Sequence, residues 1–241
     1  MPEGKTTEVI LALDVKSRSR AETVIETAGN DLLWIKIGLQ SYLRDGPGFI
    51  RDLAAQGKKV FLDLKLHDIP NTMAKAIESL ADLPVSMLTI HASAGPEAAA
   101  RCSETIALAL PDTTLLAVTV LTSMDGETLR NLGVEKSPED QVVNLATLAA
   151  EAGVGGIVCS PREIHPLRAV LPADIALVTP GIRPAGSALD DQKRVMTPAE
   201  AARAGANYLV IGRPILAAED PAAALAVIRN ELNSANQSSA P

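Results

Sequence analysis

The sequence contains few aromatic residues and few cysteines. Only 2% of its 241 residues are Phe, Trp or Tyr, and the two cysteines are Cys102 and Cys159. These cysteines lie far apart in the chain and do not form a metal-binding pattern. We therefore expect two reduced thiols in a cytoplasmic protein.

An excess of positive charge and long hydrophobic runs are also missing. Lys and Arg number 22 against 29 Asp and Glu, which gives a net charge of −7. This balance argues against broad binding to nucleic acids or anionic membranes, although a phosphate site needs only local amides and one or two cations. No apolar stretch approaches about 20 residues, and the first residues lack the basic-then-apolar pattern of a signal peptide. We expect a soluble protein without nucleic-acid or membrane partners.

The sequence does contain a regular alternation of short β-rich runs and longer helical stretches. Hydrophobic residues make up 47% of the chain, and most of them are Ala, Val, Ile and Leu. Strands are expected at residues 9–14, 32–37, 59–64, 86–91, 115–120, 156–159, 175–179 and 208–211. Helices are expected at residues 20–28, 73–80, 97–108, 139–152 and 198–203. Candidate N-caps are Asn71 or Thr72, Ser137, Ser160 and Thr197.

Repeated strand–helix units of this kind indicate a closed barrel or a large open sheet. No GxGxxG motif follows the first strand, which disfavours a dinucleotide-binding fold. A (β/α)8 barrel typically needs roughly 250 residues, close to the length of this chain. We predict an α/β protein with one domain, a (β/α)8 TIM barrel over residues 1–232, followed by a flexible tail over residues 233–241.

Charged residues occupy the C-terminal ends of the first three predicted strands. Because side chains alternate between the two faces of a strand, the branched residues there face the helices, and the inward positions are Asp14, Lys36, Asp63 and Lys65. Catalysis in such barrels takes place at this end of the strands. A neutralised ion cluster that only fills the barrel mouth is the alternative, but apolar residues would fill it at lower cost. We therefore favour a catalytic network.

A resemblance to a known family begins at residues 63–72, DLKLHDIPNT. This run resembles the signature segment of bacterial orotidine 5′-monophosphate decarboxylases. Further blocks resemble the family in order: LALDV (11–15), KIG (36–38), HASAG (91–95), VTVLTS (118–123), VTPGIRP (178–184), DQKR (191–194) and IGRPI (211–215). Together they cover the chain from residue 9 to about residue 230.

This resemblance implies an enzyme that converts orotidine 5′-monophosphate to UMP and CO2 without a cofactor or metal. It implies that Lys65 is the proton donor, with Asp63 and Lys36 as its partners in the barrel. Asp68 is expected to reach across a homodimer interface into the neighbouring site. The remaining substrate contacts implied by the family are Asp14 and Lys36 at the ribose, Ile69 and Thr72 beside Asp68, Thr122, and, at the phosphate, Pro180, Arg183, Gln192, Gly212 and Arg213.

The reaction itself explains why a lysine is needed at this position. Loss of CO2 from carbon 6 of the base leaves a carbanion in the ring plane, which the ring π-system stabilises poorly. The sequence has no metal, pyridoxal or thiamine motif that could accept the electrons. A fixed cation and a preorganised electrostatic environment are the remaining means of stabilisation. Lys65 supplies the cation and then the proton, and the carboxylates of Asp63 and Asp68 favour its charged form.

A binding site for the substrate phosphate is also predicted from the residues themselves, without the resemblance. Gly212 and Arg213 follow the eighth strand and open a short helix, where backbone amides and a guanidinium would bind an anion. Residues 180–196 form a long loop, predicted to be a lid that closes with Arg183 and Gln192 over the phosphate. The alternative is that Arg183 and Arg213 are ordinary surface arginines.

Two histidines lie near the C-terminal ends of the third and fourth predicted strands. His67 and His91 are expected to be structural residues and not acid or base catalysts.

Sugar-phosphate enzymes of the same superfamily, such as hexulose-phosphate synthase, use Mg2+ and share DxKxxD on the third strand, but HDIPNT at residues 67–72 resembles the orotidylate group. A non-enzymatic phosphate-binding barrel would not need Lys36, Asp63 and Lys65 together.

Overall fold

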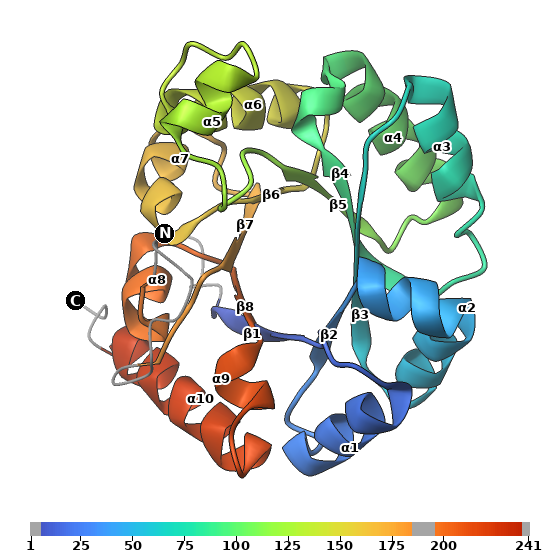
Figure 1. Cartoon of the computed structure of the whole chain (residues 1–241), viewed down its shortest axis with the longest axis vertical. Helices are drawn as coiled ribbons and strands as arrows, with labels where there is room; N and C mark the ends of the chain where they lie inside the picture. The colour runs from blue at the N-terminus through green and yellow to red at the C-terminus, as the bar shows by residue number, and fades with distance from the viewer. Residues whose placement is uncertain (1–5, 185–195, 238–241) are drawn as a thin grey trace.

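The protein folds into a closed barrel of eight parallel strands, seen in a computed structural model that describes residues 6–184 and 196–237. Each strand pairs with the next in sequence, and β8 pairs with β1. Figure 1 shows the strands as an inner ring and the helices as an outer ring. The strands are β1 (Glu8–Ala12), β2 (Trp34–Gly38), β3 (Lys59–Leu66), β4 (Val85–His91), β5 (Thr114–Val118), β6 (Gly156–Val158), β7 (Ala176–Pro180) and β8 (Tyr208–Ile211). The prediction of a single-domain (β/α)8 barrel is confirmed.

Helices connect successive strands and cover the outside of the barrel. They are α1 (Arg18–Ala28), α2 (Leu39–Ala55), α3 (Pro70–Glu78), η1 (Ala92–Ala94), α4 (Pro96–Ala109), α5 (Gly126–Asn131), α6 (Pro138–Glu151), η2 (Pro161–Glu163), α7 (Ile164–Val170), α8 (Pro198–Ala204), α9 (Arg213–Leu216) and α10 (Pro221–Gln237). Helix α10 continues to Gln237, beyond position 233 where the flexible tail was expected to begin. None of the helices in the described ranges is long and apolar enough to cross a membrane.

Helix starts agree with the sequence at three of the expected caps and differ at another. Ser160 is the N-cap of η2. Ser137 and Thr197 cap α6 and α8 through their side chains. The expected cap at Asn71 or Thr72 is wrong, because α3 begins one turn earlier, at Pro70, with Ile69 as its N-cap. Proline favours the first turn of a helix, since its φ is already helical and its missing N–H would have no partner there.

Two separate apolar layers follow from the alternation of side chains along the strands. The outer layer lies between strands and helices and includes the fully buried Leu11, Ile35 and Leu62. The inner layer fills the barrel and consists of Ile10, Ala12, Trp34, Phe61, Met87, Leu116, Val178 and Val210. Inward positions closer to the C-terminal ends carry the charged residues instead. The apolar plug thus supports a polar mouth at the end of the barrel where catalysis is expected.

Strand β3 departs from regular pairing just where the charged residues lie. Leu62 pairs with Leu88 and Leu66 pairs with Ile90, so β3 contains two more residues than β4 over this stretch. Lys65 lies within the irregularity and has a φ of 51°, a left-handed conformation uncommon for residues other than glycine. This bulge was not predicted from the sequence, although the outward direction of Leu64 and Leu66 was.

Candidate active site

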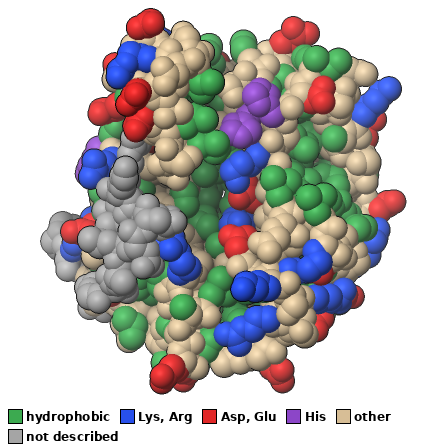
Figure 2. All heavy atoms as spheres, in the orientation of Figure 1, with side chains coloured by type: hydrophobic (Ala, Val, Ile, Leu, Met, Phe, Trp, Pro, Cys, Tyr) green, Lys and Arg blue, Asp and Glu red, His purple; other side chains and the backbone are tan. Residues whose placement is uncertain are grey.

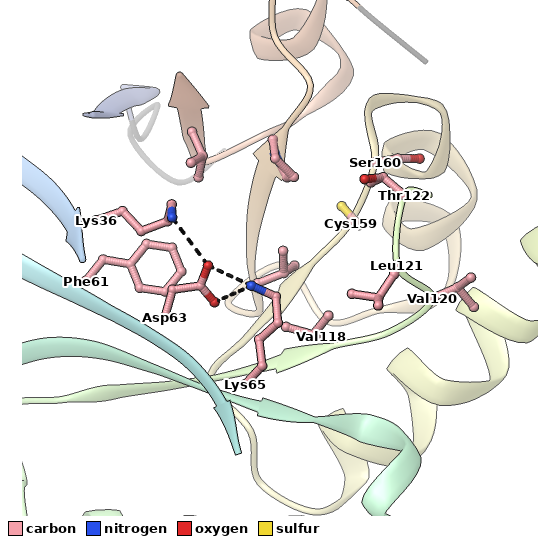
Figure 3. A pocket seen from close by; sticks show the side chains of 13 residues that line it. Lys36, Phe61, Asp63, Lys65, Val118, Val120, Leu121, Thr122, Cys159 and Ser160 are labelled. Atoms are coloured by element: carbon pink, nitrogen blue, oxygen red, sulfur yellow. Dashed lines mark hydrogen bonds and ion pairs between the residues drawn. The ribbon is translucent and has the colours of Figure 1, made fainter. Parts of the chain in front are cut away.

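Four side chains of alternating charge form a continuous network at the barrel mouth. The Lys36 Nζ atom lies 3.3 Å from Asp14 Oδ1 and 3.6 Å from Asp63 Oδ2. The Lys65 Nζ atom donates to both oxygens of Asp63, at 2.8 Å and 2.7 Å. Figure 3 shows Asp63 between the two lysines. The structure therefore brings together the residues that the sequence predicted to face inward.

Asp63 is the most enclosed carboxylate of this network. Its side chain is 11% exposed, whereas that of Asp14 is 51% exposed. Burial raises the pKa of the Asp63 carboxyl, but the charges of Lys36 and Lys65 and hydrogen bonds from Lys65 and Thr89 outweigh burial and leave this pKa below its ordinary value. Asp63 is thus a fixed negative charge that holds two cations near each other.

The charged network borders a cavity of about 200 Å³. Lys36, Asp63 and Lys65 line one side, while Val120, Leu121 and Thr122 line the opposite side (Figure 3). Further apolar contacts come from the inward ends of the neighbouring strands, namely Phe61, Val118, Val158 and Val210. In Figure 2, acidic, basic and histidine side chains gather around a hollow near the centre of the visible face. Charges beside an apolar wall interact more strongly than they would in water.

Three predicted site residues lie between the end of β3 and the first turn of α3. Asp68 is exposed, and its Oδ1 atom accepts a hydrogen bond from the backbone N–H of Ile69 at 2.7 Å. Within residues 6–184 and 196–237, no ion pair joins Asp68 to Lys36 or Lys65. Ile69 is 65% exposed, and Thr72 is also exposed. None of these three predicted site residues is among those that line the cavity beside the lysines.

The predicted phosphate residues lie around the ends of β7 and β8. Pro180 lines the cavity, and Gly212 is the N-cap of α9, which begins at Arg213. Arg183 is buried, with an exposed fraction of 6%, and its Nη1 atom donates to the carbonyl of Ile182. Arg183 is therefore not an ordinary surface arginine. Gln192 and most of the predicted lid lie outside the described residues.

His67 and His91 form a pair next to the charged network. Their ring centroids are 5.3 Å apart, and the ring planes are tilted by 37°. Burial, the neighbouring His67 and the charge of Lys65 lower the pKa of His91, while Asp63 opposes the shift. Both histidines come from the C-terminal ends of neighbouring strands. Their packing is compatible with the structural role expected from the sequence.

Sequence reasoning did not identify Thr89 or the apolar wall of the cavity. Thr89 is fully buried on β4, and its hydroxyl donates to Asp63 Oδ1 at 2.9 Å. A polar residue at an inward position between two apolar neighbours, Leu88 and Ile90, is the signal that could have revealed it. The valines of the wall carry no such signal, because in sequence they look like any core residue.

The described carboxylates of the mouth contact lysines, and they are not arranged as a metal site. Among residues 6–184 and 196–237, no group of three or more His, Cys, Asp or Glu side chains could hold a metal ion. Both cysteines, Cys102 and Cys159, are buried free thiols. Cys159 borders the cavity, and burial raises its pKa to about 12, so it remains a neutral thiol. The arrangement as a whole presents a held cation, Lys65, to the cavity.

Comparison with known proteins identifies the family. Residues 7–228 match the family described as "Orotidine 5'-phosphate decarboxylase / HUMPS family". The chain belongs to this family. A protein from Opitutus terrae named orotidine 5′-phosphate decarboxylase is 54% identical over 227 residues, covering 94% of this chain and 99% of the relative. A protein of the same name from Gluconobacter oxydans is 49% identical over 236 residues, covering 96% and 100%.

A solved structure extends the family relationship to the fold. The crystal structure of orotidine 5′-phosphate decarboxylase from Lactobacillus acidophilus superimposes with a TM-score of 0.84 at 34% identity, covering 95% of this chain and 99% of that one. The family predicted from residues 63–72 is thereby confirmed. Every charged residue of the mouth lies within the part of the chain that matches the orotidine 5′-phosphate decarboxylase / HUMPS family.

Proposed function

We propose that this enzyme decarboxylates orotidine 5′-monophosphate to UMP and CO2, the last step of de novo pyrimidine biosynthesis. The observation that carries the proposal is the Lys65 ammonium group, held by both oxygens of Asp63 at the edge of a cavity with an apolar wall. Relatives with this name match the chain over nearly its whole length. A held cation next to apolar surface suits a reaction that develops negative charge on carbon.

Lys65 is proposed to act in two stages of one reaction. When the bond between carbon 6 and the carboxylate breaks, CO2 leaves and its former electron pair stays on carbon 6. The ammonium group stabilises this negative charge and then transfers a proton from Nζ to carbon 6, which completes UMP. The neutral lysine regains its proton from solvent before the next turnover.

The other members of the network hold Lys65 and the substrate in place. Asp63 orients the Lys65 ammonium group through two hydrogen bonds, and its negative charge would also disfavour the substrate carboxylate beside it. Lys36 and Asp14 offer one cation and one acceptor beside each other at the edge of the site, which suits binding of the ribose hydroxyls. Thr122 would contact the base from the opposite side of the cavity.

The ends of β7 and β8 are proposed to bind the substrate phosphate. Gly212 has no side chain that would cover its backbone, so a phosphate group could approach the amides at the start of α9 closely. Arg213 follows directly, Pro180 is the last residue of β7, and Arg183 follows that strand. Gln192, the remaining proposed contact, lies outside the described residues. This end of a barrel commonly binds phosphate groups, since backbone amides and cations converge there.

The active unit is proposed to be a homodimer in the cytoplasm, with no cofactor or metal. Asp68, Ile69 and Thr72 are exposed, and none of them lines the cavity beside the lysines of their own chain. A second copy of the chain would accept these residues at its own site, with Asp68 next to Lys65. Burying Ile69 in such an interface would also remove an exposed apolar side chain from water.

The first experiment is incubation of the purified protein with orotidine 5′-monophosphate in excess EDTA, followed by ultraviolet absorbance as UMP forms. We expect rapid turnover at the same rate with and without EDTA. A folded protein that shows no turnover would contradict the proposal. Activity toward sugar phosphates that appears only when Mg2+ is restored would favour the metal-dependent branch of the family instead.

A further inference from the structure

Thr89 links the two catalytic residues of β3 from the neighbouring strand. It lies on β4, has an exposed fraction of 0%, and is separated in sequence from both residues it contacts. The Thr89 Oγ1 atom accepts a hydrogen bond from the backbone N–H of Lys65 at 2.9 Å. The same hydroxyl donates to Asp63 Oδ1, also at 2.9 Å.

The direction of these hydrogen bonds is fixed by chemistry. A backbone N–H can only donate, so the Thr89 oxygen must act as its acceptor. The hydroxyl proton is then available for Asp63, which as a carboxylate can only accept. Asp63 Oδ1 also receives a hydrogen bond from Lys65 Nζ at 2.8 Å. The Asp63 carboxylate is therefore held from two sides, and a hydrogen bond to a charged group is stronger than one between neutral groups.

The contact with Lys65 has a second consequence for the backbone. The bulge in β3 removes regular ladder pairing between Leu62 and Leu66, and Lys65 has a φ of 51°. A residue with a side chain persists in this conformation only where its surroundings compensate for the strain. Thr89 gives the Lys65 N–H the partner that the interrupted ladder does not supply. One hydroxyl therefore fixes both the backbone of Lys65 and the side chain that holds its ammonium group.

We propose that Thr89 is a positioning residue, which fixes the Lys65 ammonium group relative to the substrate through its paired hydrogen bonds to Lys65 and Asp63. This inference rests on the proposed function, in which Lys65 is the proton donor. Thr89 is absent from the residues lining the cavity, so it acts through Asp63 and Lys65 and not on the substrate. Its contribution should therefore appear in the rate of the chemical step and hardly at all in substrate affinity.

The test compares Thr89→Val with Thr89→Ser and with a matched control elsewhere in the barrel. Thr89→Val keeps the shape of the side chain and removes the hydroxyl. We expect kcat to fall about tenfold to hundredfold, the range for loss of a hydrogen bond to a charged group, while KM and the Kd of UMP stay within about threefold. Thr89→Ser restores the hydroxyl, so its kcat is expected within about threefold of the unsubstituted protein.

The control is Thr113→Val, which removes a different buried threonine hydroxyl. Thr113 donates to the backbone carbonyl of Val85 at 2.6 Å, just before β5 and at the opposite end of the barrel from the site. Its loss should lower the melting temperature and leave kcat unchanged. Thermal unfolding of all three variants separates stability from activity. If Thr89→Val does not fold, Thr89→Cys replaces it. Its kcat is expected to be lower than that of Thr89→Ser, but by less than about a hundredfold relative to the unsubstituted protein.

The outcomes distinguish this proposal from the proposed function. An unsubstituted protein without decarboxylase activity would overturn both. An active protein whose Thr89→Val variant retains its kcat would overturn only the role of Thr89. Equal losses of kcat in Thr89→Val and Thr113→Val, or no recovery in Thr89→Ser, would show a general effect on packing and would also overturn the role of Thr89.

Discussion

At the scale of single residues, the order of charges at the mouth determines what each side chain can do. Asp14, Lys36, Asp63 and Lys65 alternate in sign, and each lysine lies within 4 Å of at least one carboxylate. Burying an unpaired charge costs several kcal/mol, roughly, and pairing offsets much of that cost. Lys36 is the more enclosed lysine and is held between two carboxylates. Among the described residues, Lys65 has one carboxylate partner, Asp63, and it lines the cavity, which suits it to interact with a substrate.

Replacement of Lys65 with alanine tests its role directly. We expect Lys65→Ala to lower kcat by at least about a thousandfold, because both charge stabilisation and proton transfer are lost. The Kd of UMP, measured by calorimetry, should change by less than about tenfold, since the phosphate end of the site is intact. The control is Lys136→Ala, an exposed lysine before α6, which should behave like the unsubstituted protein. Turnover retained in Lys65→Ala would end the assignment of Lys65 as proton donor.

The cysteines permit a second prediction at this scale. Burial raises the pKa of Cys102 to about 11 and that of Cys159 to about 12, and their exposed fractions are 0% and 2%. The thiolate is the form that attacks a thiol reagent, so neither residue should react in the folded protein at pH 8. Titration with such a reagent is expected to detect both thiols only after unfolding in denaturant. Rapid reaction of either thiol in the folded protein would contradict this expectation.

At the scale of elements, the sequence predicts the strands well because their apolar runs are short and bounded by polar turns. The four inward charges were predicted by the same alternation, which depends only on the period of the strand. The bulge at Lys65 was not predicted, since Asp63, Leu64 and Lys65 keep the period of two and contain no glycine. The irregularity arises in the pairing of β3 with β4, which the pattern of one strand alone does not reveal. Thr89 was missed for the same reason, because its partners lie on another strand.

Strand β6 provides a prediction about packing between elements. A Cβ added at Gly156 would lie 2.6 Å from Leu116 Cδ2 and 2.9 Å from the carbonyl oxygen of Ala176, so neighbours on both sides would have to move. We expect Gly156→Ala to reduce the free energy of unfolding by about 1–3 kcal/mol, the usual effect of overpacking. The control is Gly48→Ala in α2, where an added Cβ meets nothing within 4 Å. Equal stability of the two variants in chemical denaturation would contradict this account.

At the scale of the whole molecule, large apolar side chains are exposed near the same end of the barrel as the inward charges. Leu39, Leu43 and Ile69 are 51%, 80% and 65% exposed, and they follow β2 and β3, which are adjacent in the barrel. Large apolar side chains gathered after neighbouring strands favour contact with another protein surface. Asp68 belongs to the same region. A two-fold interface here would bury these leucines and bring Asp68 of each chain to the Lys65 of the other.

Mixing two inactive variants tests whether the sites are shared. If Lys65 of one chain works with Asp68 of its partner, Lys65→Ala and Asp68→Ala dimers are both nearly inactive. After mixing and exchange of subunits, half of the dimers are hybrids, and each hybrid has one site with both residues intact. Activity should therefore return to about a quarter of that of the unsubstituted protein. The matched control mixes Lys65→Ala with Asp63→Asn, whose residues come from the same chain, so hybrid dimers contain no intact site. Recovery in the first mixture alone requires that Asp68 crosses the interface, whereas no recovery despite proven subunit exchange means that each barrel uses only its own residues.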